Sequence, residues 1–276
     1  ALKGVFDVSD PEQLGIGRDV PIGPWKNASS AKKRLQLAAA WRIENPRLWK
    51  QYLSARDSVA EEVKQLYAKY KLHRKPLKTK LDAKLQEFRH AAKEAFDVPD
   101  AKETFLLHGT KPEVLLTVLS NGPSDKFSGG LFGEGIYLAE TPTKNDQYTT
   151  IDEECISSST GNAEVAALHE RLYRSTTHPR SVYYLIICRV ALGYYDRTDN
   201  GRTSLEGASH DLWAPGATEK ELSKVETTVP PIHHHSLVVE TGGCLQRHRE
   251  FLQYHKGRVY PAYVLAYHRC LAGKHV

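Results

Sequence analysis

With 276 residues, the chain is long enough for one large domain or two small ones, and it can bury a sizeable core. A content of 40% apolar and 26% charged residues excludes a disordered or fibrous protein, and the lack of any run of 18 apolar residues argues against a transmembrane helix. The net charge of +5 is a mild basic excess, which is densest in residues 71–80.

The first third of the chain indicates an arm followed by helices. Residues 1–35 carry several Gly and Pro residues without a sustained period, so we expect a loop-rich N-terminal arm and then one domain, residues 36–276. Pro46 is typical of a first helical turn. Apolar residues then recur at spacings of three or four, which predicts a helix that buries Leu48, Tyr52, Ala55, Val59, Val63 and Leu66. A second helix is expected over residues 81–96.

From Thr104 the sequence becomes rich in strand patterns. We expect strands at residues 104–107, 136–139, 183–190, 236–240, 250–254 and 262–268. The run at 183–190 is almost continuously apolar, which predicts a strand that is buried on both faces. One further helix is expected after Thr110-Lys111-Pro112-Glu113, which fits a capping box, and another over residues 162–174. Helices first and strands later predict the α+β class.

Three short motifs carry the chemistry. His108 and Gly109 follow an apolar strand, Tyr137 lies at the start of a strand after a Gly-rich loop, and Glu250 begins a late strand. The Gly-rich loop lacks the G-x-G-x-x-G spacing of a Rossmann unit. In this order, the motifs resemble the His-Tyr-Glu signature of the poly(ADP-ribose) polymerase catalytic domain, the diphtheria-toxin-like branch of the ADP-ribosyltransferases. The resemblance extends over roughly residues 36–270.

The resemblance implies a fold, a cosubstrate and a reaction. The implied ADP-ribosyltransferase fold has N-terminal helices followed by two packed, mainly antiparallel β-sheets, with an NAD cleft between them. NAD+ is the implied cosubstrate, and ADP-ribose is transferred with release of nicotinamide. The implied acceptors are proteins, including possible automodification, and chain elongation to poly(ADP-ribose) stays open. No membrane partner is expected.

The reaction indicates which side chains the site needs. Cleavage of the nicotinamide–ribose bond builds positive charge on the ribose, so a site must fix the ring, fix both riboses and supply negative charge. By resemblance, the catalytic residues are Glu250, His108 and Tyr137. The NAD+-binding residues implied by resemblance are His108, Gly109, Thr110, Tyr137, Ala139, Lys144, Asn145 and Tyr148. Tyr137 and Tyr148 would stack on nicotinamide, Gly109 would hold its carboxamide, and Glu250 would polarise a ribose hydroxyl.

Some features depart from the family pattern. Asn145 stands where many members place a Ser, and the donor loop over residues 121–128 is short. No Cys/His cluster is evident between residues 161 and 188, so the zinc site of some relatives is not expected. His233, His234 and His235 are consecutive, so on a strand they alternate between faces and at most two converge. We therefore expect no metal.

Two alternatives to a protein-modifying enzyme stay open. The domain can be a binding module that holds NAD+ or ADP-ribose without catalysis, or it can transfer ADP-ribose to a nucleic-acid end. A contact between nucleic acid and residues 71–80 (Lys71–Lys80) would favour the second, although such a basic run is more often a solvated linker. Four scattered cysteines without a C-x-x-C pair favour a reduced, intracellular protein, and the sequence does not separate nucleus from cytoplasm.

Overall fold

The structure is a computed structural model, and it describes residues 2–8, 11–14, 33–75, 77–91, 98–124, 129–153, 162–207, 209–216, 221–271 and 274–275. Several features discussed above fall outside these ranges. They are most of the N-terminal arm, the far end of the second predicted helix, residues 125–128 of the donor loop, and Cys155.

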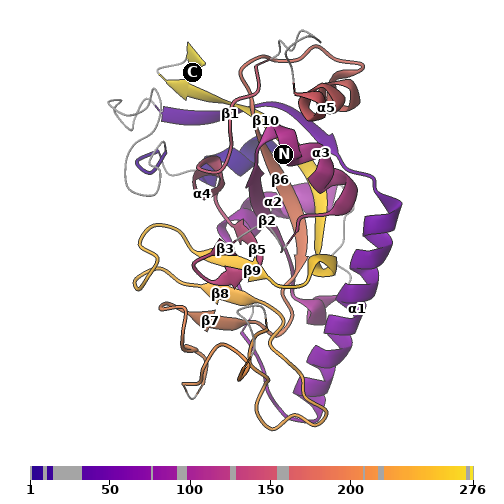
Figure 1. Cartoon of the computed structure of the whole chain (residues 1–276). Helices are drawn as coiled ribbons and strands as arrows, with labels where there is room; N and C mark the ends of the chain where they lie inside the picture. Colours follow the sequence, from indigo (N-terminus) through magenta and orange to yellow (C-terminus); the bar gives the residue numbers. More distant parts are fainter. Residues whose placement is uncertain are drawn as a thin grey trace.

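Among the described residues, nine strands form one large sheet (Figure 1). Eight of them follow the order β1 (Lys33–Arg42), β10 (Val259–Leu271), β6 (Tyr183–Ala191), β2 (Glu103–Thr110), β5 (Ile136–Ala139), β9 (Glu250–Gln253), β8 (Leu237–Val239) and β7 (Asp196–Thr198). The ninth strand, β11 (Lys274–His275), pairs with β10. All neighbours are antiparallel except β7 and β8, which are parallel.

The sheet divides into two halves between β2 and β5. Only one register pair, Leu107 with Ala139, joins these two strands. The arrangement therefore agrees with the predicted α+β class and its mainly antiparallel strands, but this junction joins the two expected sheets into one. A separate small hairpin, β3 (Gly129–Gly130) and β4 (Gly133–Glu134), precedes β5.

Strand β6 shows why helices cover both faces of the half of the sheet that contains β1, β10, β6 and β2. All nine of its residues are buried, which confirms the predicted two-sided burial. Odd-numbered residues such as Leu185 and Ile187 pack into a core with α1 (Pro46–Ala68) and α2 (Lys80–Ala91). Even-numbered residues such as Tyr184 and Ile186 pack into a second core with α3 (Pro112–Asn121) and α5 (Ala163–Tyr173).

The first helix begins as the sequence predicts. Asn45 is its N-cap, and the side-chain oxygen accepts a hydrogen bond from the Leu48 backbone N–H at 3.1 Å. The buried face contains five of the six predicted residues, whereas Ala55 is half-buried and Ala60 is buried in addition. Although α1 has 23 residues, no helix in the described part of the chain is long and apolar enough to cross a membrane.

Two local expectations were wrong. Thr110 does not cap α3, because it is the last residue of β2 and pairs with Tyr184; the N-cap is Lys111, whose side chain makes no capping bond. Residues 33–35, expected in the loop-rich arm, are the first residues of β1. The arm also contains a 3-10 helix, η1 (Leu2–Val8). Three more short elements lie in the part of the chain that the structure describes: η4 (Pro99–Ala101), α4 (Pro142–Asp146) and η5 (Lys256–Arg258).

Candidate functional site

His108 and Tyr137 meet at the junction between the two halves of the sheet. His108 follows Leu107, the β2 residue that pairs with Ala139 of β5, and its Nδ1 lies 3.0 Å from the carbonyl oxygen of Tyr137. A carbonyl only accepts hydrogen bonds, so Nδ1 carries the proton. Burial lowers the pKa of His108 below 6.5, against a smaller opposing effect of this bond. The ring is therefore neutral at pH 7, and Nε2 keeps a lone pair that can accept a hydrogen bond from a hydroxyl.

This assignment predicts how NAD+ affinity depends on pH. If Nε2 accepts a ribose hydroxyl, affinity stays constant above pH 6.5, the ordinary imidazole pKa, and falls only at lower pH, where Nε2 becomes protonated. Calorimetric titration with NAD+ across this range measures the profile. The His108→Gln variant keeps an acceptor without a titrating ring, so its affinity should not follow the same curve. A wild-type affinity that increases on acidification contradicts the assignment.

Gly109 lies against the backbone of α4. A Cβ built at this position would be 2.2 Å from the carbonyl oxygen of Asn145, so no side chain fits without movement of the backbone. The Asn145 side chain is buried, and its Nδ2 donates to the carbonyl oxygen of Thr141 at 3.0 Å. The structure thus places Gly109 and Asn145 in contact, with one amide proton of Asn145 committed to its own helix.

The two tyrosines that were predicted to stack on nicotinamide differ from each other in how firmly they are held. The Tyr137 hydroxyl accepts from the Phe132 N–H at 2.9 Å and donates to the Gly133 carbonyl at 3.0 Å. A Cβ at Gly130 would lie 2.2 Å from that hydroxyl, so the hairpin fixes one edge of the ring. Tyr148 follows α4 and is 43% exposed, which leaves much of its surface available to a ligand.

Glu250 is the first residue of β9 and is only 5% exposed. It pairs with Ala139 of β5 on one side and with Val239 of β8 on the other. Its carboxylate Oε1 lies 2.5 Å from Lys144 Nζ, and the same Nζ lies 3.1 Å from the Tyr148 hydroxyl. Lys144 therefore links the acidic side chain to the exposed tyrosine.

These contacts connect most of the predicted residues. His108 contacts Tyr137, Gly109 adjoins Asn145, Ala139 pairs with Glu250, and Lys144 joins Glu250 to Tyr148. Thr110 lies buried at the end of β2, and no contact described here joins it to the others. Neither the hairpin that holds Tyr137 nor the pairing of Arg249 with Glu140 (Arg249 Nη2 to Glu140 Oε2, 3.0 Å) was predicted from the sequence. The sequence signal for that pair was the presence of opposite charges next to Glu250 and Ala139, at Arg249 and Glu140.

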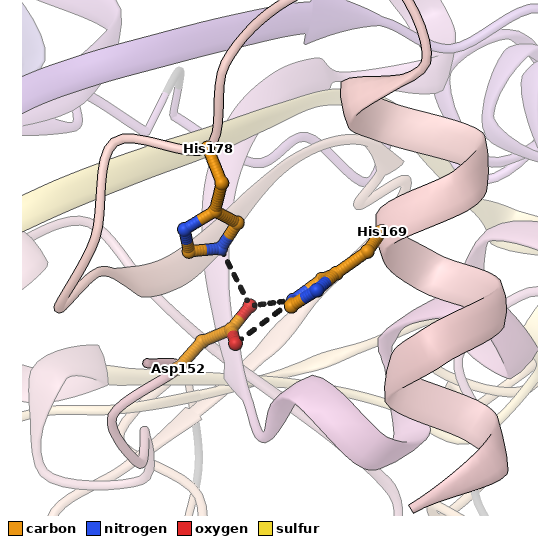
Figure 2. A group of neighbouring side chains, drawn as sticks. All are labelled: Asp152, His169 and His178. Carbon is orange, nitrogen blue, oxygen red and sulfur yellow. Dashed lines mark hydrogen bonds and ion pairs between the residues drawn. The ribbon is translucent and has the colours of Figure 1, made fainter. Parts of the chain in front are cut away.

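Two histidines from residues 161–188 converge on an acid that lies outside that range, and no cysteine is part of the group. His169 of α5 and His178 of the following loop both face Asp152, as Figure 2 shows. Their Nε2 atoms lie 2.9 Å and 3.3 Å from Asp152 Oδ2, and the Tyr184 hydroxyl donates to the same oxygen at 2.6 Å. The sequence did not reveal the cluster because Asp152 lies outside residues 161–188 and comes close to the histidines through its bridge to Val182.

Histidine and aspartate are common metal ligands, but the hydrogen bonds of this cluster fit an ionised Asp152 between the rings of His169 and His178. The Arg180 N–H donates to His178 Nδ1 at 3.1 Å, so the proton of a neutral ring lies on Nε2, which faces Asp152. A protonated Nε2 donates to a carboxylate and cannot bind a metal. Burial raises the pKa of Asp152, but the bonds from His178, Tyr184 and His169 outweigh it and hold the pKa below 3.8.

A second group, Asp196, His210 and His234, fits a metal no better. His234 Nδ1 lies 2.9 Å from the Ser223 carbonyl oxygen, so this atom carries a proton and has no lone pair for a metal. The neighbouring rings of the triplet contact other partners. His233 Nδ1 faces the Leu222 carbonyl at 2.7 Å, and His235 Nε2 faces Glu62 at 2.9 Å.

We predict that metal removal has no effect. Prolonged dialysis against EDTA should leave the melting temperature and the catalytic rate unchanged, because hydrogen bonds hold Asp152, His169 and His178 together. Elemental analysis of the purified protein should find less than stoichiometric zinc. A bound equivalent of zinc, or a lower melting temperature after dialysis that zinc restores, would disprove the tautomer assigned to His178.

The basic segment at residues 71–80 packs partly against the body of the protein. The Arg74 guanidinium lies 4.3 Å from the ring centre of Tyr194 and 3.5 Å from Glu206, and its Nε donates to the Tyr195 carbonyl. The Tyr195 hydroxyl in turn donates to the carbonyl of Lys75 at 2.7 Å. This segment is therefore partly packed and is not a fully solvated linker, and a contact with nucleic acid stays a prediction.

Comparison with known proteins gives two matches. The family model for the poly(ADP-ribose) polymerase catalytic domain matches residues 25–269. The poly [ADP-ribose] polymerase tankyrase of Caenorhabditis elegans is 33% identical over 101 residues. That alignment covers 35% of this chain and 3% of the tankyrase, so the chain spans a small part of this relative's length. The family match includes every residue of the site, from His108 to Glu250.

Proposed function

Because this chain belongs to the poly(ADP-ribose) polymerase catalytic domain family and is thus an NAD+ ADP-ribosyltransferase, we propose that it modifies proteins through the site around His108, Tyr137 and Glu250. The observation that supports this proposal most is the position of Glu250. It is a nearly buried carboxylate on the strand next to Tyr137, and it is paired with Lys144.

Each contact of the site supports a role in binding. Nicotinamide stacks between Tyr137, which the hairpin holds, and the exposed Tyr148. Its carboxamide bonds the backbone of Gly109, where a side chain would block approach. His108 offers the Nε2 lone pair to a hydroxyl of the adenosine ribose. Asn145, whose side chain is tethered to Thr141, faces the carboxamide with its remaining amide atoms.

Glu250 then acts on the reacting ribose. Its carboxylate accepts a hydrogen bond from the 2′-hydroxyl of the nicotinamide ribose. It also faces the positive charge that develops as nicotinamide leaves. Lys144 holds the carboxylate at 2.5 Å in the free protein. A ribose hydroxyl that enters this site displaces part of the Lys144 contact, and Lys144 keeps its bond to the Tyr148 hydroxyl.

Protein acceptors, and elongation in particular, form the finer part of the proposal. A retained Glu250 is compatible with elongation, because elongation requires a ribose hydroxyl to be activated as the acceptor. Transfer of single units and elongation give products of different mass, so the experiment below separates them.

The test is incubation of the purified chain with labelled NAD+, followed by a denaturing gel. A discrete labelled band means transfer of single units to the protein itself, whereas a smear of high mass means polymer. Added proteins and oligonucleotides in parallel tubes report the acceptor class. Nicotinamide release without any labelled macromolecule would refute protein modification, and label on the oligonucleotide alone would favour transfer to nucleic-acid ends.

A further inference from the structure

Three charged residues form a row beside Glu250. Ala139 and Val239 both pair with Glu250, one on each side. The next residue outward along each chain is Glu140 just after β5, Arg249 just before β9 and Glu240 just after β8. The charged row, defined as Glu140, Arg249 and Glu240, therefore crosses the ends of the three strands that surround the catalytic carboxylate.

Arg249 makes its closest ion pair of the row with Glu140. Its Nε lies 3.1 Å from Oε1 and its Nη2 lies 3.0 Å from Oε2, which is a two-point contact of guanidinium with carboxylate. The pair is largely shielded from water, with side-chain exposures of 18% for Arg249 and 7% for Glu140. On the other side, Arg249 Nη1 lies 3.7 Å from Glu240. Arg249 therefore connects the ends of β5, β9 and β8.

The same pair also binds the start of α2. Arg249 Nη2 donates to the Lys78 carbonyl at 2.9 Å, and the Lys80 N–H donates to Glu140 Oε2 at 2.6 Å. Lys80 is the first residue of α2, so Glu140 satisfies a backbone N–H that the helix itself leaves without a partner. A helix outside the sheet thus adds to the restraint on this end of β9.

We propose that Arg249 is a positioning residue for Glu250. β9 and β5 have four residues each, and Glu250 is the first residue of β9, where strand pairing ends. The contacts of Arg249 hold the chain immediately before Glu250 against Glu140, Glu240 and Lys78. The Glu250 carboxylate therefore stays within hydrogen-bonding distance of the ribose hydroxyl when substrate displaces Lys144. This inference rests on the role proposed above for Glu250.

The experiment compares Arg249→Ala with wild type in steady-state nicotinamide release and in NAD+ binding by calorimetry. We expect kcat to fall about 10- to 100-fold, because small misplacement of a reacting group has effects of that size. The dissociation constant of NAD+ should change by less than about twofold, because Glu250 acts mainly in the transition state. Arg249→Lys keeps the charge without the two-point geometry, so its kcat should lie between the two.

A second variant separates positioning from simple destabilisation. Arg249→Ala leaves the buried Glu140 charge without its partner, which alone can destabilise the fold. In the double variant Glu140→Gln/Arg249→Ala that charge is gone, and the amide oxygen introduced in its place still accepts the Lys80 N–H, so folding should recover while kcat stays low. Arg42→Ala is the matched control, because Arg42 lies 3.9 Å from Glu44 on the exposed surface.

Two results would overturn the inference. They are a wild-type kcat in folded Arg249→Ala, or a wild-type kcat in the double variant. The proposed function is tested independently by Glu250→Gln. If Glu250→Gln is inactive while Arg249→Ala is fully active, only the positioning role fails. If Glu250→Gln is itself fully active, the role of Glu250 fails and the inference fails with it.

Discussion

Replacement of Glu250 by Gln should lower kcat for nicotinamide release at least about 100-fold, the size of effect seen when one group that stabilises transition-state charge is removed. Gln has nearly the same shape but no negative charge, so it cannot offset the charge that develops on the ribose. NAD+ binding should survive, because the predicted stacking and carboxamide contacts come from Tyr137, Tyr148 and Gly109. Kinetics and calorimetric NAD+ titration of the same preparation measure both quantities.

The variant needs two controls. Glu61→Gln makes the same chemical change at a side chain that is 67% exposed and bonded to Lys64, and it should behave as wild type. Glu250→Gln also leaves Lys144 beside a neutral partner, so Lys144→Met in the Glu250→Gln background removes the unpaired charge. If this double variant regains activity, the loss came from Lys144 and not from the missing carboxylate. Unchanged turnover in Glu250→Gln itself rejects the catalytic role.

Replacement of Gly109 by Ala should impair both the fold and the site. The new Cβ would lie 2.2 Å from the Asn145 carbonyl oxygen, and because that atom is backbone, α4 must shift. We expect the free energy of unfolding to fall by about 1–3 kcal/mol, the range for overpacking a close-packed site. NAD+ affinity should fall as well, since α4 carries Lys144 and precedes Tyr148. Chemical denaturation and calorimetry measure the two effects.

Gly4→Ala is the matched control for this substitution. A Cβ at Gly4 would have Asp7 Oδ2 as its nearest neighbour at 3.7 Å, an ordinary contact. This variant should therefore keep the wild-type stability and affinity. Gly109→Ala with both quantities at wild-type values would mean that α4 does not lie as close to β2 as the structure places it.

Local patterns predicted much of the fold. The apolar run of β6 predicted a strand buried on both faces, and Asn45-Pro46 predicted the start of α1, because these signals depend on neighbours in sequence. β1 was missed, since its alternation is broken by three consecutive alanines and it is stabilised by pairing with β10 more than 200 residues away. The predicted cap at Thr110 failed because β2 continues through that residue to pair with β6.

Some contacts among the candidate site residues follow from local motifs, whereas others depend on residues that are distant in the sequence. Tyr137 lies on β5, Lys144 lies on α4, and Tyr148 follows α4, so a short stretch of sequence was enough to group these three residues. The pairing of Arg249 with Glu140 depends on strand register, and the convergence of His169 and His178 on Asp152 depends on packing of α5 against the sheet. Neither register nor packing is encoded in any short stretch.

The most direct measurement is a crystal structure of the chain with a non-cleavable NAD+ analogue. The account predicts nicotinamide between Tyr137 and Tyr148, its carboxamide on the backbone of Gly109, the adenosine ribose on His108 Nε2, and the Glu250 carboxylate on the 2′-hydroxyl of the nicotinamide ribose. An analogue bound elsewhere, or a nicotinamide ribose that lies out of hydrogen-bonding reach of Glu250, would contradict the proposal that these residues form one NAD+ site.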